Sequence, residues 1–202
     1  MRFQFDPHLS HQRRAVEVVL ELFRGHEGVP DEASLLESLQ GVQEAEGLPI
    51  ASSLDGREFT LDMETGTGKT YVYLRTLHEL HRRHGLNRAV IVVPSVAIRE
   101  GVLQQIRATR DHFAELFGGQ RIIESLYEPS KLSELKRFSS DPGLQVLVLN
   151  MDAFNKGWSN LIHRPTDGLD GRRPISLIAD ARPVVILDEP QNLEGPSTRT
   201  AV

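Results

Sequence analysis

From residue 59 onward, short apolar runs alternate with longer segments in which apolar residues recur every three or four positions. The short runs predict buried strands, and the periodic segments predict amphipathic helices. Strands that alternate with helices form βαβ units, so the sequence predicts an α/β fold with a parallel sheet covered by helices on both faces. The predicted strands are residues 59–63, 89–93, 121–126, 144–149 and 184–187, and the predicted helices are residues 69–84, 96–117 and 130–138.

The chain before residue 59 is patterned differently. An apolar stripe at helical spacing predicts one amphipathic helix that begins at residue 7 or 11 and ends at residue 23. Residues 25–57 contain several glycines and prolines, and we expect a surface excursion there with one short helix around residues 35–39.

Two other patterns carry weaker expectations. Residues 157–182 predict a long loop with one helical turn at residues 175–178. His78, His81 and His84 recur at three-residue spacing. No acidic or cysteine partner stands out beside them, so we expect an exposed helix face rather than a metal site.

Residues 63–70 carry the first chemical signal, because a glycine-rich run follows an apolar stretch and opens a helix. Small residues let backbone N–H groups close around phosphate oxygens, and the helix N-terminus adds its partial positive charge. Lys69 is then placed for the β- and γ-phosphates, and the Thr70 hydroxyl for Mg²⁺. The predicted ATP-binding residues of this run are Thr65, Gly66, Thr67, Gly68, Lys69 and Thr70.

An acidic pair carries the second signal. Asp188 and Glu189 follow the predicted strand 184–187, and ligands of open α/β sheets bind at the carboxyl ends of strands. Asp188 is the candidate for holding Mg²⁺ through its water shell, and Glu189 the candidate for polarising the attacking water. With Lys69 they are the predicted catalytic residues. The alternative is that the two carboxylates only cap the strand end.

Composition narrows the class of protein. A chain of 202 residues suggests one domain with a sizeable core, and its net charge of −5 argues against an overall basic nucleic-acid binder, although not against a local groove. The absence of cysteine excludes disulfides and cysteine-based zinc sites and fits the cytoplasm. No apolar run approaches the roughly 18 residues of a membrane span, and the first residues lack a signal-peptide core.

The two chemical runs together support a family resemblance. Residues 65–70 with residues 188–191 resemble motifs I and II of superfamily 2 helicase-like ATPases. Residues 5–12 resemble the Q motif, whose glutamine, here Gln12, reads adenine. Residues 92–101 resemble motif Ia, and residues 149–156 resemble the segment before motif II. The set is most similar to the Res (motor and nuclease) subunit of type III restriction–modification enzymes.

The resemblance implies the first RecA-like motor lobe of a DNA translocase that hydrolyses ATP with Mg²⁺. Its regions are a Q-motif-like helix over residues 1–24, the excursion over residues 25–57 and the ATPase lobe over residues 58–202. The alternatives are another superfamily 2 DNA or RNA helicase, a metabolic phosphotransferase, and a truncated module that binds nucleotide or nucleic acid without catalysis. By resemblance, the candidate nucleic-acid contacts are Pro94, Ser95, Arg99, Gly101, Asn150, Asp152 and Asn155, several of which could instead be ordinary helix caps.

The resemblance also implies parts that follow Val202 in a longer polypeptide, namely a second RecA-like lobe and a nuclease domain, and a modification methyltransferase subunit as partner. In such lobes one further strand, which comes after motif II, lies between the strands of motifs I and II. Residues 192–202 contain no apolar run that could form it. We therefore expect residues 1–202 alone to be unstable or sticky, to bind ATP weakly and to hydrolyse it very slowly.

Overall fold

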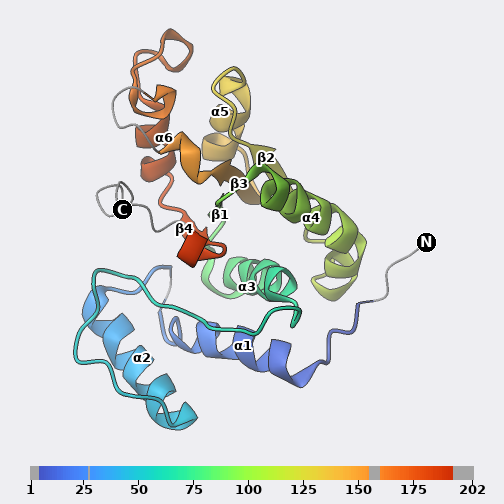
Figure 1. Ribbon diagram of the computed structural model, residues 1–202, viewed down its shortest axis with the longest axis vertical. Helices are drawn as coiled ribbons and strands as arrows, with labels where there is room; N and C mark the ends of the chain where they lie inside the picture. The colour runs from blue at the N-terminus through green and yellow to red at the C-terminus, as the bar shows by residue number, and fades with distance from the viewer. Residues whose placement is uncertain (1–4, 27, 155–159, 193–202) are drawn as a thin grey trace. The chain divides into compact units, whose positions relative to one another are not determined.

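A computed structural model describes residues 5–26, 28–154 and 160–192 (Figure 1). Asn155 and residues 193–202 lie outside the described residues. The chain divides into two compact units, Met1–Leu86 and Asn87–Val202. The first contains the helices α1 (Ser10–Glu21), α2 (Glu32–Glu46) and α3 (Lys69–His84). The second contains β1 (Arg88–Val93), α4 (Val96–Leu116), β2 (Ile122–Leu126), α5 (Leu132–Ser140), β3 (Leu144–Asn150), α6 (Pro174–Asp180) and β4 (Val184–Leu187).

The second unit is built on a parallel sheet with the strand order β2-β3-β1-β4. The connections from β1 to β2 and from β2 to β3 run in opposite directions across this sheet, so right-handed crossovers place α4 on one face and α5 on the other. The connection from β3 to β4, which contains α6, crosses the sheet in the same direction as the connection from β2 to β3, which contains α5. The two helices pack against each other (Figure 1). This arrangement confirms the predicted RecA-like α/β fold with helices on both faces of the sheet.

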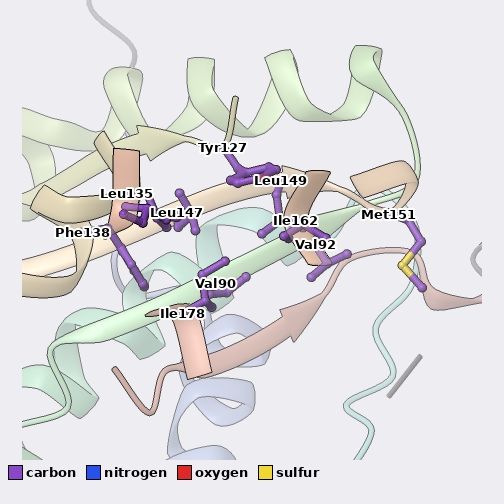
Figure 2. Close-up of a cluster of buried hydrophobic side chains, with 11 residues drawn as sticks. Val90, Val92, Tyr127, Leu135, Phe138, Leu147, Leu149, Met151, Ile162 and Ile178 are labelled. Atoms are coloured by element: carbon purple, nitrogen blue, oxygen red, sulfur yellow. The ribbon is translucent and has the colours of Figure 1, made fainter. Parts of the chain in front are cut away.

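The core of the second unit lies between the sheet and the α5–α6 layer (Figure 2). Nearly every residue of β1 and β3 is buried, as expected for parallel strands covered on both faces. Alternate residues of these strands face the α5–α6 layer. Burial raises the pKa of Tyr127 to about 12, so its phenol stays neutral in this core. The buried cluster consists of Val90, Val92, Tyr127, Leu135, Phe138, Leu147, Leu149, Met151, Ile162, Leu169 and Ile178.

The connection from β3 to β4 contributes to this core, which corrects the prediction of a long loop. Within the described part of this connection, short 3₁₀ helices precede α6, namely η1 (Met151–Ala153), η3 (Leu161–His163) and η4 (Asp167–Leu169). α6 includes the helical turn predicted at residues 175–178. Ile162 and Leu169 are buried, and a Cβ at Gly168 would approach Leu132 Cδ1 to 2.7 Å. The loop prediction was wrong because its apolar residues are too widely spaced to show a period, yet they pack against α5.

In the first unit α1 packs on both α2 and α3. The predicted stripe of α1 is buried, including Val16 and Leu20. α2 is far longer than the short helix predicted around residues 35–39. The Ser34 backbone N–H donates to the Asp31 carboxylate at the N-cap, which lowers the pKa of that carboxyl, and Gly47 ends the helix with a φ of 67°.

The predicted strand at residues 59–63 is absent, and this prediction was wrong. These residues lie outside every described strand, and Phe59 and Leu61 are exposed. A strand needs a neighbour for its backbone N–H and C=O groups. No described residue pairs with this segment, and among the described strands β4 pairs only with β1. The apolar side chains of Val185 and Leu187 in β4 are also exposed, like those of Phe59 and Leu61.

The expected exposed histidine face is also wrong, because none of the three histidines is exposed. His78 is only 1% exposed, whereas His81 and His84 are half-buried. The His84 Nδ1 lies 2.9 Å from the His26 carbonyl oxygen, to which it donates. The described residues contain no group of three or more His, Asp or Glu side chains that could hold a metal ion.

Burial of His78 predicts that mild acid destabilises the protein. Burial, together with the nearby His81, lowers the His78 pKa from 6.5 to about 4, and Glu79 opposes the shift only weakly. Between these pH values the unfolded chain binds a proton that the native chain excludes, so stability falls as the pH drops from about 6.5 toward 4, by up to about 3 kcal/mol.

Thermal unfolding of the wild type and of His78→Leu between pH 7 and pH 5 measures this effect. We expect the variant to lose part of the pH dependence, while His8→Leu, at an exposed position, keeps it. Equal slopes for wild type and His78→Leu would show that His78 does not take up this proton.

Candidate active site

The glycine-rich run forms a tight turn that leads directly into α3. The Thr67 backbone N–H and hydroxyl both donate to the Glu64 carbonyl, at 3.3 and 2.6 Å. Gly66 and Gly68 have φ values of 82° and 90°, which only glycine adopts without strain. Gly68 is the N-cap of α3, so Lys69 and Thr70 are its first two residues. The structure thus places both side chains at a helix N-terminus, where an anion is stabilised.

The first turn of α1 contacts this glycine-rich turn. Gln12 Nε2 donates to the Thr67 carbonyl oxygen at 2.9 Å, and His11 Nε2 lies 3.2 Å from the same oxygen. Gln12 is buried, with 8% of its surface exposed. The structure therefore brings Gln12, 55 residues away in sequence, to the glycine-rich turn that the sequence analysis singled out separately.

Three residues at this junction were missed by the sequence analysis. Besides His11, they are Tyr71, whose ring stacks on Phe5 at a centroid distance of 6.0 Å, and Arg75, which donates to the Pro7 carbonyl at 2.6 Å. Their positions in the sequence could have indicated this role. His11 directly precedes Gln12, while Tyr71 and Arg75 lie in the first two helical turns after Thr70. They attach the Q-motif-like segment to α3.

Gly68 is the position where the turn and Gln12 come closest. A Cβ built at Gly68 would lie 2.4 Å from Gln12 Nε2, whereas one at Gly66 would meet nothing within 4 Å. We expect Gly68→Ala to displace the Gln12 amide and break its hydrogen bond. Gly66→Ala has the same backbone strain without the clash, so Gly68→Ala should lose about 1 kcal/mol more in free energy of unfolding.

Chemical denaturation of the two variants measures this difference. In a Gln12→Ala background, the two alanine substitutions should become equally costly, because the clashing group is gone. A difference that persists in that background would mean that Gly68 is required for another reason.

In the second unit, the carboxyl ends of β3, β1 and β4 are neighbours. Val93 pairs with Asn150, and the Asp188 N–H donates to the Val92 carbonyl at 3.0 Å. The residues that follow these three strands therefore lie along one edge of the sheet. They are Asn150, the last residue of β3, with Asp152 after it, Pro94 and Ser95 after β1, and Asp188 and Glu189 after β4.

The remaining candidates lie at the start of α4, and Ser95 and Arg99 make contacts of their own. Ser95 Oγ accepts the Ile98 N–H at 3.3 Å and is the N-cap of α4, as predicted. Arg99 Nη2 donates to Glu100 Oε1 at 2.8 Å, and the arginine side chain is 21% exposed. Gly101 is exposed within α4.

Asn150 and Asp152 differ in how they are engaged. The Oδ1 atom of Asn150 is buried and has no hydrogen-bond partner among the described residues. The Asp152 backbone carbonyl accepts from Asn160 Nδ2 at 2.8 Å. Asn150 thus has unused hydrogen-bonding capacity at the edge of the sheet.

The acidic pair ends β4 with an unusual backbone. Glu189 has a φ of 54°, and the 3₁₀ helix η5 (Pro190–Asn192) begins directly after it. Gln191 Nε2 donates to Glu189 Oε2. Both carboxylates are half-buried. They therefore project from a constrained turn at the carboxyl edge of the sheet.

A parallel sheet with an acidic pair at its carboxyl edge and a glycine-rich turn at a helix N-terminus are features of helicase-like motor proteins. The comparison with known families agrees. The chain belongs to the family described as type III restriction enzyme, Res subunit, which matches residues 7–199.

Individual relatives point to the same family. The chain is 30% identical over 203 residues to the Res subunit of the type III restriction-modification enzyme StyLTI of Salmonella typhimurium, and 27% identical over 226 residues to that of EcoPI of Escherichia phage P1. These alignments cover 90% and 93% of the chain, but only 19% and 23% of the relatives. No solved structure matches the chain. None of the described helices is long and apolar enough to cross a membrane.

Proposed function

We propose that this chain binds Mg²⁺–ATP and hydrolyses it as the first motor lobe of a type III restriction enzyme acting on DNA. The observation that carries the proposal is the glycine-rich turn at the N-terminus of α3, with Gln12 hydrogen-bonded to it. Family membership supports the helicase-like class, and ATP hydrolysis is the finer step that we propose.

The residues of the turn fit a nucleotide phosphate and its Mg²⁺. Gly66 has open space around its Cβ position, and Thr65 and Gly66 are exposed, so the turn can admit an anion. The backbone N–H groups of residues 65–70 and the Lys69 ammonium would neutralise phosphate charge. Bound Mg²⁺ would polarise the phosphate oxygens, and oxygen ligands such as the Thr70 hydroxyl and the Asp188 carboxylate, the latter through water, suit this ion.

In this mechanism the chain's own groups position water and charge. Glu189 would orient the attacking water and accept its proton. Lys69 would stabilise charge on the β- and γ-phosphates, and Gln12 would recognise the adenine edge with its amide. Glu189 is the only one of these groups that needs to change its protonation state during the reaction.

The DNA contacts, partners and location are further parts of the proposal. Ser95 caps α4, Arg99 and Gly101 lie in its first two turns, and Asn150 and Asp152 lie at the end of β3; these residues could contact strand phosphates. Both named relatives are Res subunits of restriction–modification enzymes. We propose a modification subunit and a second lobe with a nuclease as partners, acting in the cytoplasm.

Steady-state ATP hydrolysis with and without duplex DNA tests the function, using the native polypeptide that carries these residues. We expect Mg²⁺-dependent turnover that DNA stimulates. Turnover that is indifferent to DNA would favour a phosphotransferase or a simple ATPase, and tight binding without turnover would favour a non-catalytic module.

Asp188→Asn is expected to weaken the response to Mg²⁺, because the amide removes the charge that holds the hydrated ion. A titration of ATP hydrolysis with Mg²⁺ should show the half-saturating concentration raised about tenfold, the cost of roughly 1.4 kcal/mol of binding. Asp167→Asn, at an exposed position in η4, is the matched control. An unchanged Mg²⁺ midpoint in Asp188→Asn would remove Asp188 from the metal site.

A further inference from the structure

The backbone of Glu189 has a conformation that few glutamates adopt. Its φ of 54° lies in the left-handed region, and the next residue is Pro190, whose ring favours an extended conformation for the residue before it. Strain of this kind persists only where surrounding contacts maintain it. The contacts of this turn should therefore fix the direction of the Glu189 side chain.

Two features of the backbone constrain the turn on either side of Glu189. The Asp188 N–H donates to the Val92 carbonyl at 3.0 Å, which continues the β1–β4 pairing to the residue before Glu189. Pro190 begins η5, where its fixed φ suits the first helical position. Glu189 is thus held between the end of a strand and the start of a helix.

A side chain also contacts Glu189 directly. The 3₁₀ turn of η5 directs Gln191 back over Glu189, and its Nε2 donates to Glu189 Oε2. We propose that Gln191 is a positioning residue, which orients the Glu189 carboxylate so that it can activate the attacking water. This inference rests on the proposed ATP hydrolysis.

A glutamine amide suits this task because it donates a hydrogen bond without adding charge. A hydrogen bond at Oε2 would restrict the rotation of the carboxylate and leave Oε1 to accept from the attacking water. A lysine or arginine in place of Gln191 would stabilise the ionised carboxylate and reduce its tendency to take a proton. Gln191 is itself exposed, so its contact with Glu189 contributes little to packing.

The test uses Gln191→Met, which keeps the length of the side chain and removes its N–H groups. We expect kcat for ATP hydrolysis to fall about tenfold or more, while KM for ATP stays within about twofold, since a misdirected base affects the reaction and not nucleotide binding. Gln104→Met, at an exposed position of α4, is the control and should leave both constants unchanged. Thermal unfolding checks that Gln191→Met remains folded.

A double-mutant cycle separates positioning from a structural role. In a Glu189→Gln background the carboxylate is absent, so Gln191→Met should cause no further loss of residual turnover. The same fold loss in both backgrounds, an unchanged kcat, or a faster kcat would each overturn the proposal. If Lys69→Ala and Glu189→Gln also leave turnover intact, the proposed function fails as well, whereas a loss in both of those variants with a normal Gln191→Met overturns only the role of Gln191.

Discussion

Replacing Lys69 with alanine should abolish tight ATP binding or hydrolysis. Lys69 is the first residue of α3 and follows the left-handed Gly68, so it is placed where β- and γ-phosphate charge must be neutralised. Removal of such a charge from a phosphate site costs on the order of 10²-fold or more in turnover. Nucleotide affinity and steady-state hydrolysis, measured in the native polypeptide that carries these residues, give the result.

Lys136→Ala is the matched control, because Lys136 is an exposed residue of α5 in the other unit. Its variant should keep wild-type affinity and turnover. Near-normal values of both quantities in Lys69→Ala would show that the glycine-rich turn does not bind the phosphates of ATP, and the proposed function would then lose its main support.

Glu189→Gln should leave ATP binding intact and lower turnover by two or more orders of magnitude. The amide keeps the shape of the side chain but cannot accept a proton from water, and general-base catalysis contributes about 10²–10⁴-fold. Binding of ATP at equilibrium and single-turnover hydrolysis measure the two quantities separately.

A comparison of the two acidic variants tests their division of roles. Glu189→Gln should keep the wild-type Mg²⁺ midpoint, whereas Asp188→Asn should shift it. Identical Mg²⁺ dependence in the two variants would mean that the carboxylates do not act as one metal ligand and one base.

The sheet of the second unit was readily predicted from sequence because most of its strands are short, largely apolar runs, and β1 and β3 are buried on both faces. Four β-branched or leucine residues at Val184–Leu187 form β4 over the predicted range, and β1 and β3 differ from prediction by one residue at one end. A strand covered on both faces must be apolar at every position. It can therefore be recognised from its own residues, without knowing which strand it pairs with. The helices between these strands were found by their period, because only one face of each is apolar.

The signal for α2 was used only in part, because the leucine spacing predicted a short helix around residues 35–39 and the N-cap Asp31 was not recognised. Asp31 is followed three residues later by Ser34, and Leu35, Leu39 and Val42 recur at helical spacing. Only Leu35 and Val42 of the helix are buried. The N-cap and the period predict a helix of this length, but the many glycines nearby obscured it.

The candidate site was only partly predictable. The sequence identified Lys69, Thr70, Asp188 and Glu189 from local runs, because each run carries its chemistry within a few residues. It did not show that Gln191 would contact Glu189, since this depends on the left-handed φ of Glu189 and on the turn of η5. Asn155 lies outside the described residues, and its role stays a prediction.

What the sequence by itself determined is the set of elements and motifs whose signals are local: the apolar strands, the periodic helices and the glycine-rich and acidic runs. The tertiary structure alone decided the rest, because contacts between distant residues leave no local period. It placed Gln12 on the Thr67 carbonyl and buried His78 on a helix that reads as polar. It also left residues 59–63 without a strand partner, and an apolar run cannot form a strand unless another backbone satisfies its hydrogen bonds.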